Sequence, residues 1–179
     1  HSPPECHPGT RKTVCIQIEK WFKGSSSAKS PLLWLHGPAG VGKSVIAKTI
    51  AGRCHDQVVA TFFFSTSSDR SAATLSPTLA WQLARKIPET KQHIIAALKN
   101  NASLLTSEIK EQFEHLIAQP LKKCSTTSTS LPVMVIDGID ECTDEYMLSR
   151  FLQVLVCAGE SGDMPLRFII CSRPESRIR

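Results

Sequence analysis

Apolar positions along the chain follow two patterns, short continuous runs and stripes with a helical spacing. Four short runs rich in β-branched and aromatic residues predict buried strands at residues 32–36, 58–64, 131–137 and 166–175. The segments between the runs mostly repeat apolar residues every three or four positions, which predicts helices. Buried strands that alternate with helices favour an α/β fold, with a mainly parallel sheet and helices on both of its faces.

Prolines and capping residues mark the expected helix ends. One helix precedes the first strand, with Thr10 as its N-cap. Pro77 at the first helical position opens another helix, and Pro88 ends it. Further helices are expected at residues 43–54, 91–99 and 107–119, and around an apolar stripe from Leu148 to Val156. The polar residues 122–130 predict a surface loop.

A glycine-rich segment follows the first predicted strand and opens a helix. It fits the pattern G-x-x-x-x-G-K-[ST] and consists of Gly37, Pro38, Ala39, Gly40, Val41, Gly42, Lys43 and Ser44. The glycines let backbone N–H groups point at phosphate oxygens, and the helix amino terminus adds partial positive charge. Lys43 is predicted to contact the β- and γ-phosphates, and the Ser44 hydroxyl to ligate Mg²⁺. A glycine turn with a helix-capping serine is the alternative.

Acidic residues follow the third predicted strand. Asp137 ends the strand, where an isolated carboxylate is costly unless it is solvated or paired. A Mg²⁺ ion held by Asp137 and Ser44 supplies that pairing. Asp140 and Glu141 come next, and one of them would orient or deprotonate an attacking water. The alternative is a solvated acidic turn that caps the following helix.

An arginine follows the fourth predicted strand. Because ligands in open parallel sheets bind at the carboxyl ends of the strands, Arg173 is predicted to reach the γ-phosphate and to report its presence. A surface arginine near a chain end is the alternative.

Composition narrows the remaining classes. The 179 residues are 41% hydrophobic and 21% charged, as in ordinary globular domains, and no apolar run is long enough to span a membrane. The net charge of +5 comes from scattered residues, so no specific nucleic-acid partner is expected. Seven cysteines without a CxxC pair argue against disulfides and zinc, and favour a reducing, cytoplasmic compartment. The chain begins with His1 and shows no signal peptide pattern, so we expect a piece of a larger protein.

The motifs together resemble the NACHT family of STAND-class signal-transduction ATPases, above all the nephrocystin-like amino-terminal NTPase module of fungal NACHT proteins that carry repeats. The stretches that carry this resemblance are CHPGTRKTV, LLWLHGPAGVGKS, FFFSTSSDR, LSPTLAWQLARKIP, VMVIDGIDEC and LRFIICSRPESRIR. The resemblance implies a three-layer P-loop NTPase that binds ATP or ADP with Mg²⁺ through a Walker A loop and a Walker B acid. It also implies that Thr10 and Arg11 lie against the adenine. Residues 1–30 would flank the nucleotide site, and residues 31–179 would form the core.

Two departures from the family pattern qualify this expectation. Gly138 stands where many related ATPases place a catalytic glutamate, so water activation would depend on Asp140 and Glu141. The chain also lacks the family's helical, winged-helix and repeat segments, which would be its partners together with other copies on activation. The favoured function is a switch that hydrolyses ATP slowly. A non-hydrolysing nucleotide-binding scaffold is the alternative, and a phosphotransferase is disfavoured because residues 88–130 contain no arginine.

Overall fold

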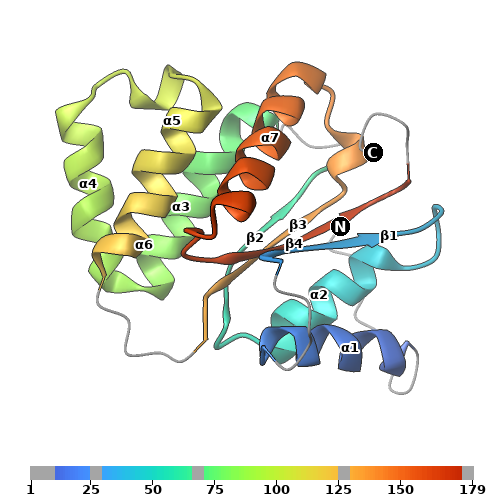
Figure 1. Ribbon diagram of the computed structural model, residues 1–179. Coiled ribbons are helices and arrows are strands. Elements are labelled where there is room, and N and C mark those ends of the chain that lie inside the picture. The colour runs from blue at the N-terminus through green and yellow to red at the C-terminus, as the bar shows by residue number, and fades with distance from the viewer. Residues whose placement is uncertain (1–10, 25–29, 66–70, 125–129, 175–179) are drawn as a thin grey trace.

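The four predicted strands form one fully parallel sheet. The computed structural model describes residues 11–24, 30–65, 71–124 and 130–174. The strands are β1 (Leu32–His36), β2 (Val58–Phe63), β3 (Val133–Asp137) and β4 (Arg167–Ser172). Their order in the sheet is β1-β4-β3-β2 (Figure 1). The predicted α/β fold class is therefore confirmed, and the strand boundaries differ from prediction by at most three residues.

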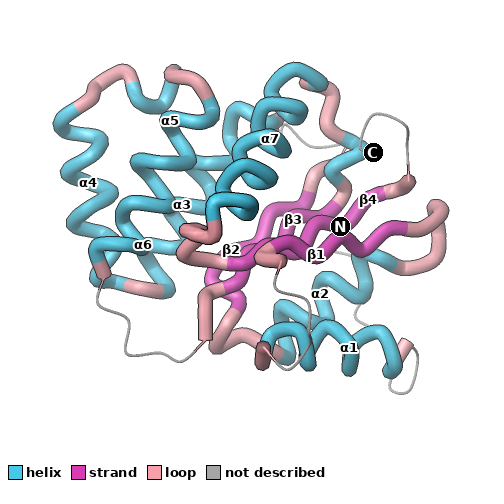
Figure 2. The backbone as a smooth tube through the Cα atoms, viewed as in Figure 1, coloured by secondary structure: helices cyan, strands magenta, loops and turns pink. Residues whose placement is uncertain are grey.

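Helices cover both faces of the sheet. They are α1 (Lys12–Phe22), α2 (Lys43–Arg53), α3 (Leu75–Lys86), α4 (Lys91–Asn100), α5 (Ile109–Phe113), α6 (Gln119–Lys123) and α7 (Glu145–Ser161). In Figure 2 the helices α1 and α2 lie below the sheet, and α3 to α7 lie above and beside it. Each group has its own hydrophobic cluster against the strands, which makes three layers.

Alternate residues of the strands supply the two clusters. On β3, Val133 and Val135 pack toward α1 and α2, whereas Met134 and Ile136 pack toward the larger helical layer. All of β3 is buried, because both of its faces are covered and it has strand neighbours on both sides. This explains why the strand is a continuous apolar run rather than an alternating one.

Two predicted helix starts are wrong. Thr10 lies outside the described residues, and the N-cap position of α1 is occupied by Arg11, whose φ of 56° is left-handed. The helix predicted to begin at Pro77 begins at Leu75, after a short 3-10 turn, Ala72–Thr74. Proline is tolerated there because N–H groups of the first helical turn have no partner within the helix.

The helix predicted at residues 107–119 is interrupted. After α5, residues Glu114–Ala118 form a π-helical turn, and α6 then continues to Lys123, past the predicted end. The wider turn ends two residues before Pro120, which lacks the N–H needed to continue a regular α-helical ladder. In α7, Leu148 is buried as expected, but Val156 is 48% exposed, so the apolar stripe is narrower than predicted.

Candidate nucleotide-binding site

The sheet order brings the predicted site segments to one edge. β4 lies between β1 and β3, with His36 opposite Ser172 and Asp137 opposite Cys171. The glycine loop after β1, the acidic segment after β3 and Arg173 after β4 therefore leave the sheet side by side. This edge is where open parallel sheets bind their ligands.

The glycine loop connects β1 to α2 through two left-handed residues. Gly40 has a φ of 78° and Gly42 a φ of 85°, conformations that residues with a Cβ rarely adopt. Gly42 is the N-cap of α2, so the loop ends at the amino terminus of an eleven-residue helix. The N–H of Gly37 donates to the carbonyl oxygen of Ser172 at 3.4 Å, which ties the start of the loop to the end of β4.

The side chain of Lys43 lies over its own loop. Its ammonium donates to the carbonyl oxygens of Gly37 at 2.6 Å and Pro38 at 2.8 Å. The loop therefore carries a cation at its mouth, in addition to the partial positive charge of the helix terminus. Both features attract an anion.

The Ser44 hydroxyl reaches across to the acidic strand. It donates a hydrogen bond to the carboxylate of Asp137, whose residue is only 5% exposed. Burial raises the pKa of Asp137 above its ordinary value, and the bonds from Ser44 and from the Gly138 N–H oppose that rise only in part. The structure thus brings together the two residues predicted to hold a metal ion.

This pair fits Mg²⁺ that arrives with a nucleotide. Within the described segments, no group of three or more His, Cys, Asp and Glu side chains lies close enough together to hold a metal by itself. Mg²⁺ on phosphates needs only one or two protein oxygens, and keeps phosphate and water oxygens for its other positions. A divalent cation at Asp137 would also offset the cost of burying its carboxylate.

The backbone conformation and the space at residue 138 both require a glycine. Its φ is 70°, and a Cβ built on it would lie 2.9 Å from the carbonyl oxygen of Phe64. A glutamate cannot occupy this position without strain and overlap. The structure therefore explains why the acids follow later, on the 3-10 turn Ile139–Glu141.

Asp140 and Arg173, predicted separately, are bonded to each other. The main-chain N–H of Arg173 donates to Oδ1 of Asp140 at 3.1 Å, and its Nε donates to Oδ2 at 2.7 Å. The side chain of Asp140 is 4% exposed and that of Arg173 is 45% exposed. Burial alone would raise the pKa of Asp140, but the hydrogen bonds from Arg173 outweigh it and hold the pKa below its ordinary value. Glu141 is partly buried at the end of the same turn.

Arg11, directly before α1, contacts the glycine loop from the same side of the sheet as α2. A Cβ built on Gly42 would lie 2.5 to 2.8 Å from three atoms of the Arg11 guanidinium, so the guanidinium lies directly against this glycine. Helix α1 is fixed below the sheet by Trp21, whose carbonyl oxygen accepts a hydrogen bond from Arg167. Of the two residues predicted near adenine, Arg11 thus lies beside the phosphate loop, and Thr10 lies outside the described residues.

Two residues that sequence reasoning did not assign support this edge. The indole Nε1 of Trp34 donates to the hydroxyl of Ser172 at 2.8 Å, and the Ser172 side chain is fully buried. The carbonyl of the same serine binds Gly37. A serine that ends an apolar strand directly before an arginine was the available signal.

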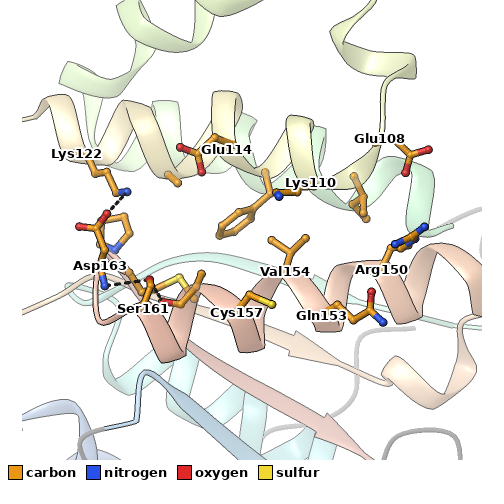
Figure 3. Close-up of a pocket in the computed structure, with 16 residues that line it drawn as sticks. Glu108, Lys110, Glu114, Lys122, Arg150, Gln153, Val154, Cys157, Ser161 and Asp163 are labelled. Atoms are coloured by element: carbon orange, nitrogen blue, oxygen red, sulfur yellow. Dashed lines mark hydrogen bonds and ion pairs between the residues drawn. The ribbon is translucent and has the colours of Figure 1, made fainter.

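The structure also contains a cavity of about 670 Å³ elsewhere. It lies between the segment from α5 to α6 and helix α7, and no residue of the glycine loop or the acidic turn lines it (Figure 3). Phe113 and Val154 are among its apolar lining residues, and Lys122 and Asp163 form an ion pair at one end. None of the helices in the described segments is both long and apolar enough to cross a membrane.

The fold and the loop together define a class of protein. A parallel sheet with a strand, a G-x-x-x-x-G-K-S loop and a helix in succession is the arrangement of P-loop domains. Within that class, the family model described as nephrocystin 3, N-terminal matches residues 10–173, and the chain belongs to this family. The resemblance to nephrocystin-like modules is confirmed.

Similarity beyond the family is remote. No curated protein matches the chain. A solved structure of the pCW3 conjugation coupling protein TcpA, in monomer form with ATPγS, is similar at 18% sequence identity and a TM-score of 0.40. The match covers 83% of this chain and 44% of that chain, so the chain spans less than half of the TcpA structure.

Proposed function

We propose that this chain is the nucleotide-binding module of a NACHT-type signalling switch, which binds ATP or ADP with Mg²⁺. The observation that carries the proposal is the contact between Ser44 and Asp137 at the mouth of the glycine loop, beside the Lys43 ammonium. Phosphate oxygens would replace the loop carbonyls as partners of Lys43. Ser44 and Asp137 would hold the Mg²⁺, which would supply positive charge to neutralise the phosphates.

Slow hydrolysis follows from the position of the acids. Gly138 excludes a carboxylate directly after Asp137, and Asp140 already accepts two bonds from Arg173. Glu141 would therefore orient the attacking water. In this proposal the ATP- and ADP-bound states differ through contacts to the γ-phosphate, and the difference controls the conformation or oligomerisation of a larger protein.

Nucleotide binding is tested with a fluorescent ATP analogue in the presence of Mg²⁺. The wild-type chain is expected to bind it, and Lys43→Ala to weaken binding by about 100-fold, because charge-assisted contacts to both the β- and the γ-phosphate are lost. Lys48→Ala is the matched control, since Lys48 lies on the same helix, about one and a half turns beyond Lys43. Equal affinity of the wild type and the Lys43 variant would refute the assignment of the loop.

A second function, a scaffold that binds nucleotide without hydrolysing it, is favoured by the engagement of Asp140 with Arg173. Glu141→Gln separates the two. A switch is expected to turn over more slowly than about 1 s⁻¹, and the variant would retain ATP where the wild type holds ADP. An unchanged ratio of bound ATP to ADP in the variant would favour the scaffold.

A further inference from the structure

The bonds between Asp140 and Arg173 join two residues to which the sequence motifs assign separate roles. One carboxylate accepts from both the main-chain nitrogen and Nε of the same arginine. These two bonds close a ring through the arginine's own Cα, Cβ, Cγ and Cδ. The ring restricts the side-chain torsions of a long, flexible residue, and it is anchored on a carboxylate that is almost fully buried.

We propose that Asp140 is a positioning residue for Arg173: it holds the guanidinium in a γ-phosphate-sensing orientation before nucleotide binds. The inference rests on the proposed function, because it names the regulation of that same site. Asp140 uses the Nε–H, and a guanidinium carries four further N–H donors on its two Nη nitrogens. The side chain that carries these donors is 45% exposed. Preorganisation of this kind makes a contact to a ligand stronger because less freedom is lost on binding.

The position of Arg173 suits such a role. The carbonyl oxygen of Ser172, the preceding residue, accepts a hydrogen bond from the N–H of Gly37. Arg173 therefore lies next to the start of the glycine loop. β4 separates β1 from β3, which places Arg173 between the loop and Asp137. A γ-phosphate held by the loop would therefore lie at the same edge of the sheet as Arg173.

Water activation is the competing role for Asp140, and the geometry disfavours it. Both oxygens of its carboxylate accept hydrogen bonds from Arg173. The same bonds hold its pKa below the ordinary value, whereas a general base works best with a pKa near the operating pH. Glu141, partly exposed on the same turn, is better suited to contact water.

The test measures γ-phosphate discrimination, the ratio of the Kd for ADP to the Kd for ATPγS, by competition with a fluorescent ADP in Mg²⁺. Arg173→Ala is expected to lower this ratio about 10-fold, as for the loss of a charge-assisted bond. Asp140→Asn is expected to lower it by a similar factor, and the double variant by no more than Arg173→Ala alone. Asp144→Asn is the control on the same segment, because Asp144 caps α7 through Met147 and asparagine caps equally well.

Two results would overturn the inference. One is an unchanged ratio in Asp140→Asn. The other is an effect that multiplies with that of Arg173→Ala to about 100-fold, since independent groups combine in this way. Affinity for ADP, which has no γ-phosphate, reports whether each variant is folded. Failure of the proposed function has a different result: the wild-type chain itself would bind neither nucleotide. Failure of the positioning role alone would leave wild-type binding intact.

A measurement on the wild-type chain avoids dependence on a variant that folds poorly. The ¹⁵N-labelled Arg173 Nε–H, assigned by its absence in Arg173→Ala, is expected to exchange slowly with solvent both without nucleotide and with ATPγS. Fast exchange without nucleotide, or loss of the signal when ATPγS binds, would mean that Asp140 does not hold Arg173 in the sensing state. Either outcome would refute the positioning role.

Discussion

The glycine after the acidic strand offers the sharpest test of the site's architecture. Gly138→Ala adds one methyl group at a residue with a φ of 70°. The left-handed conformation costs an alanine about 1–2 kcal/mol. The added Cβ would also lie 2.9 Å from the carbonyl oxygen of Phe64, and such overpacking costs a further ~1–3 kcal/mol.

The overlap cannot be relieved by a small shift. The N–H of Phe64 donates to the carbonyl oxygen of Asp137 at 2.9 Å, so moving the Phe64 carbonyl away would strain the same backbone connection. We therefore expect the variant to lose about 3 kcal/mol in free energy of unfolding. For a chain of this length, that loss corresponds to a fall in Tm of roughly 6–12 °C.

Gly162→Ala is the matched control for this prediction. Gly162 has a φ of 71°, but a Cβ there would meet no atom within 4 Å. Both variants change the unfolded chain equally, so their difference isolates the contact with Phe64. Urea unfolding followed by circular dichroism measures both. Equal losses of stability, with equal m-values, would refute the claim that backbone overlap excludes a side chain at residue 138.

Three other predictions concern charge, strain and thiol reactivity. Burial raises the folded-state pKa of Asp137 above its unfolded value of about 3.9. This group's contribution to stability is therefore fully present below the unfolded pKa, and it is lost as the pH rises through the folded pKa. In urea titrations, Asp137→Asn is thus expected to raise the free energy of unfolding at pH 7 but not at pH 3. The same variant should abolish the Mg²⁺ dependence of ATP binding. A gain in stability at pH 3 alone would contradict the predicted sign. Arg11→Gly and Arg11→Ala should weaken ADP binding to the same extent. Only glycine adopts the left-handed φ of residue 11 without strain, so the glycine variant should have a higher urea midpoint of unfolding than the alanine variant. Equal midpoints would count against strain at Arg11. Iodoacetamide at pH 7.5 should alkylate the exposed Cys157 long before the buried Cys171, because burial raises the pKa of the Cys171 thiol. Mass spectrometry of peptides measures the two rates. Equal rates would mean that β4 opens readily.

Local patterns were sufficient to predict the elements and the loop. Strand β3 is an unbroken apolar run, and the contiguous G-x-x-x-x-G-K-S motif marks the start of α2. Two of the errors lie beside prolines. Pro77 is within the first turn of α3, and Pro120 follows a π-helical turn that makes room for it. The sequence shows the proline but not the neighbouring turn.

The pairings within the site could not be predicted in the same way. Asp140 and Arg173 are 33 residues apart, and nothing in either segment indicates that one binds the other. Their contact depends on the order of strands in the sheet, which hydrophobic patterning does not encode. The contact between Arg11 and Gly42 likewise depends on how α1 packs below the sheet. Gly138 was recognised as unusual, but its necessity depends on the position of the Phe64 carbonyl.

The strand order has a consequence for biosynthesis. Among the described residues, β1 is hydrogen-bonded only to β4, which is the last strand to be translated. At ribosomal speeds of about 5–20 residues per second, roughly seven to twenty-seven seconds separate the emergence of the two strands. A nascent chain that stopped before Arg167 would already contain the whole phosphate loop, yet would have no partner to hold its first strand in the sheet. The earliest part of the site to be synthesised would thus be the last to be fixed in place.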